Sequence, residues 1–302
     1  MVINPYKCAV LMMAIVFFVS QGSCSRANSP EANRGEAPEP SLQTEPEQII
    51  VVDPEDPLEQ YLVERDSELI FNDFLQRILK EAEIPPDLIR RVSSLAAEGP
   101  AFILDLLAAM EGDPYLRCLV DKQHPLPPDY EPDDLTELGS GSYELGRSGL
   151  LLRRAAAEAL EEMAAAAAAE GITLRVSSAY RSFVYQEEVY ARNVREMGQE
   201  AADRESARPG YSQHQTGLVV DFGSIDDSFA QTAAGRWVLV NASRFGWSLS
   251  FPQGYEAVTG YRWESWHYRY MGRELAYFID TYFEGIQQYA LQFLRSWEQA
   301  EA

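Results

Sequence analysis

The sequence predicts an α+β fold, in which a small, mostly antiparallel sheet is flanked by helices and preceded by a helical extension. Short runs rich in β-branched and aromatic residues indicate strands, at 172–177, 218–222 and 247–251. Longer stretches with apolar residues at helical spacing lie between these runs and before them. The chain has 302 residues, 46% of them hydrophobic, which is enough for one or two domains with a full core.

The chain is strongly acidic, with 47 acidic and 25 basic side chains and a formal net charge of -22. Such a charge repels nucleic acid and anionic membrane surfaces. We therefore expect no nucleic-acid partner, and a small molecule or another kind of polymer as the ligand.

Residues 1–24 have the features of an export signal. Lys7 precedes an apolar run at 8–19, which is too short to span a bilayer, and small or polar residues follow it. Cys24, after Gly22 and Ser23, is similar to the cleavage site of a bacterial lipoprotein. Cleavage by an ordinary signal peptidase would instead leave the chain without an anchor. We expect an exported protein of the periplasm or cell envelope, with a possible lipid anchor at Cys24.

Residues 25–57 are rich in Pro, Glu, Ser, Ala and Asn, and little in them can be buried. We expect a disordered acidic linker, which is either a tether for an anchored protein or a plain spacer. With Cys24 lipidated, Cys118 would be the one thiol of the mature chain, which would exclude a disulfide within it.

Residues 58–113 predict a helical accessory segment. The apolar spacing is helical, and it is broken at Pro85-Pro86 and at Gly99-Pro100, which indicates three helices. The segment either binds a partner or packs on the domain that follows it.

A second domain is expected at 114–302. Its helices are predicted at 148–169, 183–197 and 232–245, each followed by a glycine, with one closing helix at 273–297. His124 precedes a proline-rich stretch that favours an extended loop, so we leave it out of the site.

Two of the three histidines lie near carboxylates in the sequence, His214 before Asp221 and His267 after Glu264. Asp221 falls on a predicted core strand, where a carboxylate needs a partner because unpaired burial is costly. His214, Asp221 and His267 supply the three protein ligands of a catalytic zinc site. A turn at 264–267 would place Glu264 beside the metal as a general base.

The same residues also have plainer interpretations. His214 and Asp221 would form an ordinary hydrogen-bonded pair, and His267 would be a polar neighbour in an aromatic core strand around Trp266. The HExxH signature of many zinc peptidases is absent. The ligand set also leaves Mn²⁺ or Cu²⁺ open.

Arg181 closes a block, Ser178-Ala-Tyr-Arg181, that follows the predicted strand at 172–177. A guanidinium at the end of a core strand is well placed to bind an anion in bidentate fashion. A surface salt bridge is the alternative.

The motifs Ser212-x-His214-x-x-Gly217-x-x-x-Asp221 and Glu264-x-Trp266-His267-x-x-Tyr270 resemble the zinc D-alanyl-D-alanine carboxypeptidases of the VanY type, which act on bacterial cell-wall peptides. The likeness extends from near Leu119 to Gly272, about half of the chain. Further blocks stand in the family order, at 121–130, 178–182, 206–210, 241–246 and 259–261.

The resemblance implies a D,D-carboxypeptidase that uses zinc to remove the C-terminal D-alanine from peptidoglycan stem peptides. Glu264 would be its base, and Arg181 would hold the substrate carboxylate or the oxyanion. Ser212 and Gln186 would contact the substrate. The alternatives are an L,D-carboxypeptidase acting on tetrapeptide stems and a non-catalytic lipoprotein that binds the cell wall. We expect a monomer.

Three positions depart from the family pattern. Ala179 stands where glycine is usual, Gln213 where glutamate is common and Ser265 where proline is common. None of them is a presumed ligand, so we expect an effect on loop or backbone geometry.

Overall fold

A computed structural model describes the backbone of residues 57–301 and the side chains of residues 68–300. The chain divides into two units, residues 1–75 and 76–302. Helix α2 (Pro57–Glu81) begins in the first unit and ends in the second. The predicted export signal, Cys24 and all but the last residue of the predicted linker lie outside the described residues.

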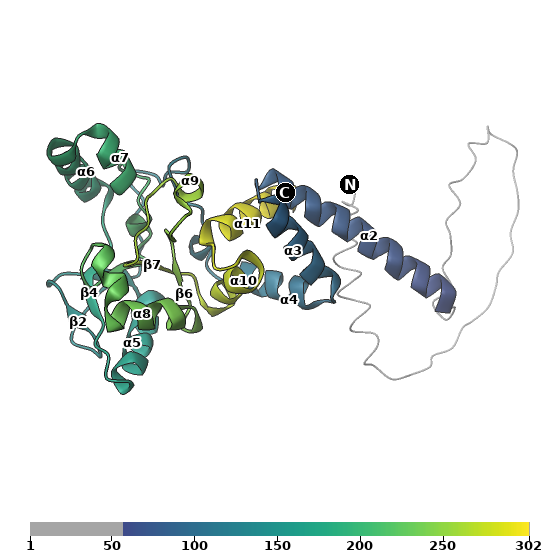
Figure 1. Cartoon of the computed structure of the whole chain (residues 1–302), viewed down its shortest axis with the longest axis horizontal. Helices are drawn as coiled ribbons and strands as arrows, with labels where there is room; N and C mark the ends of the chain where they lie inside the picture. The colour runs from purple at the N-terminus through teal and green to yellow at the C-terminus, as the bar shows by residue number, and fades with distance from the viewer. Residues whose placement is uncertain (1–56, 302) are drawn as a thin grey trace, which may run out of the picture. The chain divides into compact units, whose positions relative to one another are not determined.

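The main sheet has five strands in the order β2-β4-β5-β7-β6, and all neighbours are antiparallel except β2 and β4. This arrangement confirms the predicted small, mostly antiparallel sheet (Figure 1). A separate two-stranded sheet pairs β1 (Leu135–Glu137) with β3 (Leu151–Arg153). The main strands are β2 (Glu144–Leu145), β4 (Arg175–Ser178), β5 (Val219–Phe222), β6 (Trp247–Leu249) and β7 (His267–Tyr270).

The hydrophobic core lies between this sheet and helix α5 (Arg154–Ala169). The alanines of α5 allow this helix to pack close to the sheet. Leu218, Val220 and Phe222 point into the same core, as their alternation along the strand predicts. Only 154–169 of the helix expected at 148–169 form α5, because residues 151–153 form β3 and residues 148–150 are irregular. Leu151 and Leu152, placed on that helix by the sequence, lie in β3 and pair with β1.

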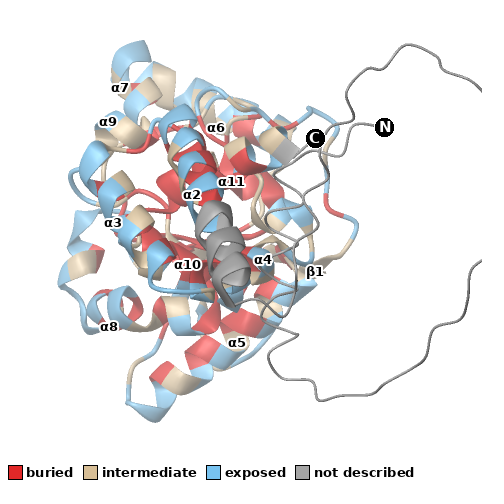
Figure 2. Cartoon of the chain, turned by 90° about the vertical axis from the view of Figure 1, so that its right-hand side faces the viewer, coloured by how far each residue is buried: buried red, intermediate tan, exposed pale blue. Residues whose placement is uncertain are grey.

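The chain after β7 forms two helices, α10 (Arg273–Phe283) and α11 (Gln287–Glu301), where the sequence predicted one. Glu284 and Gly285 adopt φ values of 54° and 75°, a left-handed conformation that a continuous helix excludes. The buried faces of α10 and α11 are seen in Figure 2.

Two helices of the predicted accessory segment, α3 (Pro86–Ala97) and α4 (Ala101–Met110), pack against α10. Phe102 of α4 lies fully buried among Phe278, Tyr282 and Phe293. The Tyr282 hydroxyl also donates a hydrogen bond of 2.8 Å to Asp105. The helical extension is thus confirmed, and these two helices share a core with the C-terminal helices.

The remaining helices border the sheet and the site. The α-helices are α6 (Phe183–Met197), α7 (Gln199–Glu205), α8 (Ala233–Asn241) and α9 (Glu256–Thr259). The short 3₁₀ helices are η1 (Pro114–Leu116), η2 (Gln213–Thr216), η3 (Asp227–Gln231) and η4 (Ala242–Phe245).

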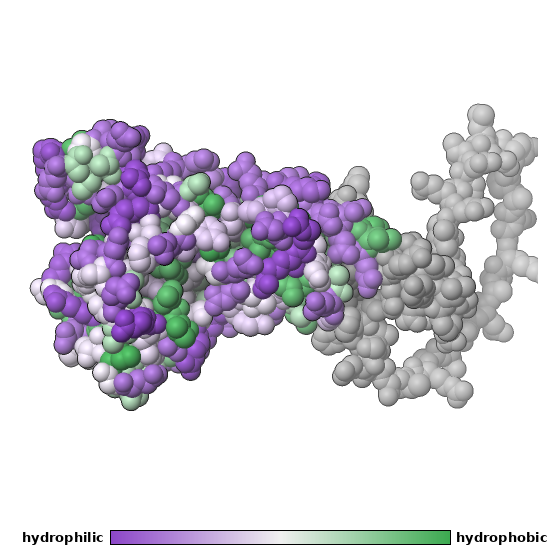
Figure 3. All heavy atoms as spheres, in the orientation of Figure 1, coloured by the Kyte–Doolittle hydropathy of each residue, from purple (hydrophilic) through white to green (hydrophobic). Residues whose placement is uncertain are grey.

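The molecular face drawn in Figure 3 is largely hydrophilic, in keeping with the acidic composition. No single helix among the described residues has the length and apolar character needed to cross a membrane, although α3 and α4, which meet at a bend of 108°, pass that test as a pair.

Candidate metal centre and active site

Gly217 connects the two candidate ligands of the first motif, His214 and Asp221. It follows η2, which carries His214, and its φ of 70° turns the chain directly into β5, which carries Asp221. A Cβ at this position would lie 2.9 Å from both Arg153 Cγ and Leu135 Cδ2. Glycine is therefore required for its conformation and for its lack of a side chain.

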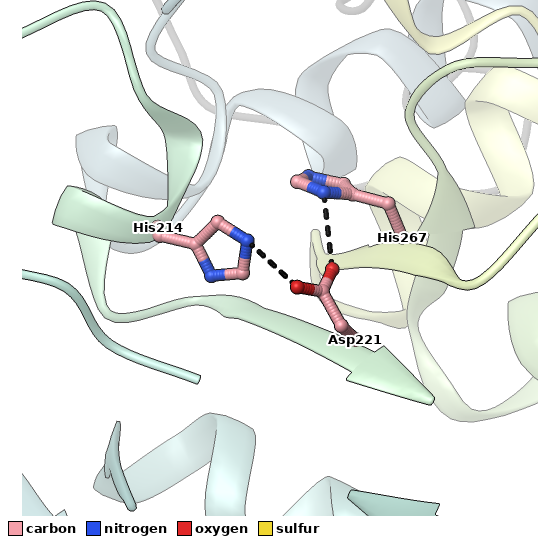
Figure 4. Close-up of side chains that lie close together, drawn as sticks. All are labelled: His214, Asp221 and His267. Carbon is pink, nitrogen blue, oxygen red and sulfur yellow. Dashed lines mark ion pairs between the residues drawn. The ribbon is translucent and has the colours of Figure 1, made fainter. Parts of the chain in front are cut away.

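Asp221 and His267 lie opposite each other in the antiparallel register of β5 and β7. Asp221 Oδ2 is 3.2 Å from His214 Nε2, and Asp221 Oδ1 is 3.3 Å from His267 Nδ1. Figure 4 shows both imidazole rings turned toward the carboxylate. One ligand atom from each residue lies within 4.8 Å of the others, and all three residues are buried. No other group of this kind exists in the part of the chain that the structure describes.

The donor set fits a metal ion. Asp221 Oδ1 is buried and accepts no hydrogen bond, in spite of the nearby imidazole nitrogen. Burial would raise the pKa of Asp221, but the two histidines outweigh burial and hold its pKa well below the usual range. The ionised carboxylate of Asp221 lacks a hydrogen bond at one oxygen and lies between two imidazoles. Together these three groups form a ligand set that suits zinc.

His214 is held as a neutral imidazole, the form in which histidine binds metal ions. Its Nδ1 lies 2.7 Å from the Ala179 carbonyl oxygen, so this nitrogen donates and Nε2 is bare toward Asp221. Burial lowers the pKa of His214 to about 4. His214 is therefore uncharged at neutral pH, as a metal ligand must be.

His267 lies in a more acidic environment. Its Nδ1 is 3.3 Å from Asp221 Oδ1 and also 3.3 Å from Glu264 Oε2. Burial alone would lower the pKa of His267, but the two carboxylates raise it to about 9. In the metal-free protein a proton thus occupies the position where a cation is expected.

Glu264 reaches the site through the turn that the sequence predicts. The His267 amide donates to the Glu264 carbonyl at 3.2 Å, which brings both side chains to the same side. Burial raises the pKa of the Glu264 carboxyl. A buried carboxylate with a raised pKa beside a metal-binding group is suited to accept and return a proton.

Arg181 lies at the same site, and two hydrogen bonds to neighbouring side chains fix its guanidinium. Its Nη1 donates to Gln186 Oε1 at 2.8 Å, and its Nη2 donates to Ser178 Oγ at 3.3 Å. Gln186 in turn donates to the Ala207 carbonyl at 2.6 Å. Asp221 and Glu264 attract the guanidinium electrostatically.

The candidate metal-binding group, Glu264 and Arg181 all line one cavity of about 270 Å³. Most of the predicted site residues line it, and Gln186 does not, since its amide faces Arg181 and Ala207. Arg192 and Asn193 extend the lining along α6. The predicted residues that line the cavity are Arg181, Ser212, His214, Asp221, Glu264 and His267.

Two supporting interactions could not be found in the sequence. Gln213 Oε1 lies 3.3 Å from His267 Nε2, across 54 positions, and Gln186 supports Arg181 instead of facing the cavity. His124 Nδ1 lies 2.8 Å from Asp121 Oδ1.

The fold and the site together define a metallopeptidase. Residues 149–273 match the family model described as VanY, D-alanyl-D-alanine carboxypeptidase. The chain belongs to this VanY family of D-alanyl-D-alanine carboxypeptidases, as its motifs predict.

Two curated relatives are similar over most of their length. The "Putative carboxypeptidase YodJ" of Bacillus subtilis (strain 168) is 35% identical over 199 residues, which are 61% of this chain and 73% of the relative. A D-alanyl-D-alanine carboxypeptidase of Enterococcus faecalis is 30% identical over 215 residues, which are 67% of this chain and 77% of the relative.

Solved structures agree with the fold. The LdcB LD-carboxypeptidase is 35% identical, with a TM-score of 0.50 over 56% of this chain and 85% of its own. The vancomycin-resistance D,D-dipeptidase VanXYg, 24% identical with a TM-score of 0.51, covers 59% of this chain and 70% of its own.

Proposed function

We propose that the chain is a zinc D,D-carboxypeptidase that removes the C-terminal D-alanine from peptidoglycan stem peptides. One observation carries the proposal: a buried donor set of two histidines and one aspartate shares a cavity with a carboxylate and a guanidinium. The family assignment and the D-alanyl-D-alanine carboxypeptidase of Enterococcus faecalis support the substrate class.

His214, Asp221 and His267 would hold the metal, which would supply a Lewis acid for the scissile carbonyl and for the attacking water. Glu264 accepts the proton of that water and returns it to the leaving amine. Arg181, fixed by Gln186 and Ser178, binds the terminal carboxylate of the peptide or stabilises the developing oxyanion. Ser212, on the cavity wall, contacts the peptide backbone.

A second reaction is favoured by a specific observation. The LdcB structure, similar at 35% identity and a TM-score of 0.50, is that of an LD-carboxypeptidase. The same site in this chain would then cut the bond to D-alanine in a tetrapeptide stem. A non-catalytic protein that binds the cell wall is the third possibility, and the cavity, which contains both the donor set and Glu264, argues against it.

The three functions are separated by mass spectrometry of purified muropeptides incubated with the zinc-loaded full chain. Pentapeptide and tetrapeptide stems are compared side by side, with Glu264→Ala as the inactive control. Loss of one alanine from the pentapeptide alone supports the proposal, and loss from the tetrapeptide assigns the L,D reaction. If zinc binds and neither stem changes, the hypothesis that the chain is a peptidase for these substrates is wrong.

We also infer an envelope location, since stem peptides are found there. The features of residues 1–24 support this inference, and Cys24 is the proposed anchor. Partition of the expressed protein into a detergent phase, abolished by Cys24→Ala, would support an anchor. Equal partition of the two chains would contradict it.

A further inference from the structure

Each imidazole of the metal-binding group has its second nitrogen against an oxygen atom. For His214 this oxygen is the backbone carbonyl of Ala179, 2.7 Å from Nδ1. For His267 it is the side-chain oxygen of Gln213, 3.3 Å from Nε2. The two histidines therefore present opposite nitrogens to Asp221, Nε2 from His214 and Nδ1 from His267.

The orientation of the Gln213 amide follows from its other contact. Its Nε2 lies 3.5 Å from the carbonyl oxygen of Val120, which accepts hydrogen bonds and cannot donate one. The nitrogen of the amide must therefore face Val120, and the oxygen must face His267. Gln213 is buried although it also borders the cavity, and these two contacts are the partners that the described structure gives to the two ends of its side-chain amide.

This orientation decides where His267 carries its proton. An amide oxygen only accepts, so His267 Nε2 must be protonated to form the hydrogen bond. A neutral imidazole has one N–H group, which leaves Nδ1 with a free lone pair. That lone pair points at the side of the ring where Asp221 Oδ1 and Glu264 Oε2 lie.

We propose that Gln213 is a positioning residue that fixes the Nε2–H tautomer and the ring orientation of His267 and so sets the affinity of the metal site. The inference rests on the metal site of the proposed function. Gln213 lies on the 3₁₀ helix η2 and contacts His267 on strand β7, while its neighbour His214 is itself a proposed ligand. The short helix η2 therefore helps to position both histidines. A substitution can remove this support, whereas the support of His214 comes from the main chain.

The first test is zinc affinity of the full chain, measured by competition with a coloured chelator. Gln213→Met removes the acceptor and keeps a side chain of similar size. Its zinc affinity is expected to fall by about 10–100-fold, the usual effect of losing a supporting contact of this kind. Gln213→Glu keeps an oxygen at the same position, and its zinc affinity is expected to stay near the wild-type value. The shorter side chain in Gln213→Asn does not bring its acceptor within reach of His267, so this variant is expected to lose zinc affinity as Gln213→Met does.

Gln215 provides a matched control. It lies on the same 3₁₀ helix, is as deeply buried, and donates to the carbonyls of Pro127 and Tyr130 without contacting a ligand. Gln215→Met removes a buried glutamine amide from the same segment and is expected to leave zinc affinity unchanged. Equal losses in Gln213→Met and Gln215→Met would overturn the proposal in favour of a general effect on η2.

A spectroscopic test separates positioning from stability. The chain has three histidines, so the imidazole N–H signals of the zinc-loaded protein are few and can be assigned by substitution. The His267 Nε2–H signal is expected in the wild type and in Gln213→Glu, and its loss to solvent exchange is expected in Gln213→Met. The His214 Nδ1–H signal, held by Ala179, should persist in all three.

Wild-type affinity together with a retained His267 signal in Gln213→Met would overturn the inference while leaving the metal site intact. If the wild-type chain itself fails to bind zinc, the metal site of the proposed function is wrong, and this inference falls with it. If Gln213→Met does not fold, Gln213→Asn carries the test, and wild-type affinity in that variant would likewise overturn the proposal.

Discussion

Asp221 on β5 and His267 on β7 face each other in the antiparallel register, with Asp221 Oδ1 3.3 Å from His267 Nδ1. Backbone pairing thus places two members of the candidate metal-binding group together. The third member, His214, is brought to the same carboxylate by the turn at Gly217. Each of these features leads to a measurable expectation.

Glu264→Gln should slow hydrolysis on the order of a hundredfold or more while zinc stays bound, because the amide cannot accept the proton of the water. Steady-state kinetics and metal analysis of the purified variant provide the two readouts. Full activity with bound zinc would show that Glu264 is not the base.

The rate should also fall on the acidic side at a higher pH than a free glutamate would produce. Burial raises the pKa of Glu264, and its base form is lost as the pH falls through that raised value. The pH profile of kcat/KM reports this pKa in the free enzyme. An acidic limb at or below the ordinary glutamate pKa would contradict the assignment.

Zinc binding should release about one proton from His267 and strengthen as the pH rises. The pKa of His267 is raised to about 9 in the metal-free protein, so zinc displaces its proton below that pH, with affinity changing about tenfold per pH unit. His214, with a pKa of about 4, is already neutral near pH 6 and contributes little.

Calorimetry in two buffers of different ionisation enthalpy measures this release. The titration is best done at about pH 6, below the pKa of about 7 of a zinc-bound water. Glu264→Gln should release a similar number of protons. Zinc uptake without proton release would mean that His267 is neutral before the metal binds.

Gln186→Leu should lower kcat/KM by about tenfold or more through Arg181, because the guanidinium loses its acceptor at Nη1. Zinc affinity should not change, since Gln186 touches no ligand. Glu187→Ala, an exposed neighbour on the same helix, serves as the control. An unchanged kcat/KM in Gln186→Leu would show that Arg181 needs no support from behind.

Gly217→Ala should destabilise the fold and weaken the metal site together. The left-handed φ of 70° costs a residue with a side chain about 1–3 kcal/mol, and the contacts at 2.9 Å with Arg153 and Leu135 add to that cost. Gly254→Ala has a φ of 88° and open space around it, so urea unfolding of both variants isolates the contribution of the contacts. Equal losses would mean that the contacts relax.

The meeting of His214, Asp221 and His267 could be predicted in part from two local rules. The alternation along 218–222 put Asp221 on a core strand, and the spacing of Glu264 and His267 needed only a turn. The resemblance to a family then selected the metal over an ordinary His–Asp pair. The family assignment confirms that choice of class.

The supporting contacts and some element types were not predictable. Gln213 meets His267 across 54 positions, and no local pattern signals such a pair. Leu151 and Leu152 have a spacing that suits the following helix, but pairing with β1 places them in a strand. The break between α10 and α11 depends on Glu284 adopting a left-handed conformation that glutamate rarely takes.

The most direct test of the account is D-alanine release from a pentapeptide stem by the full chain before and after removal of its metal. Release is expected to stop with a chelator and to return when zinc is added, and zinc-loaded Glu264→Gln is expected to release D-alanine slower than the wild type on the order of a hundredfold or more. Equal release by the metal-free and zinc-loaded chains, or release at the wild-type rate by Glu264→Gln, would contradict these expectations.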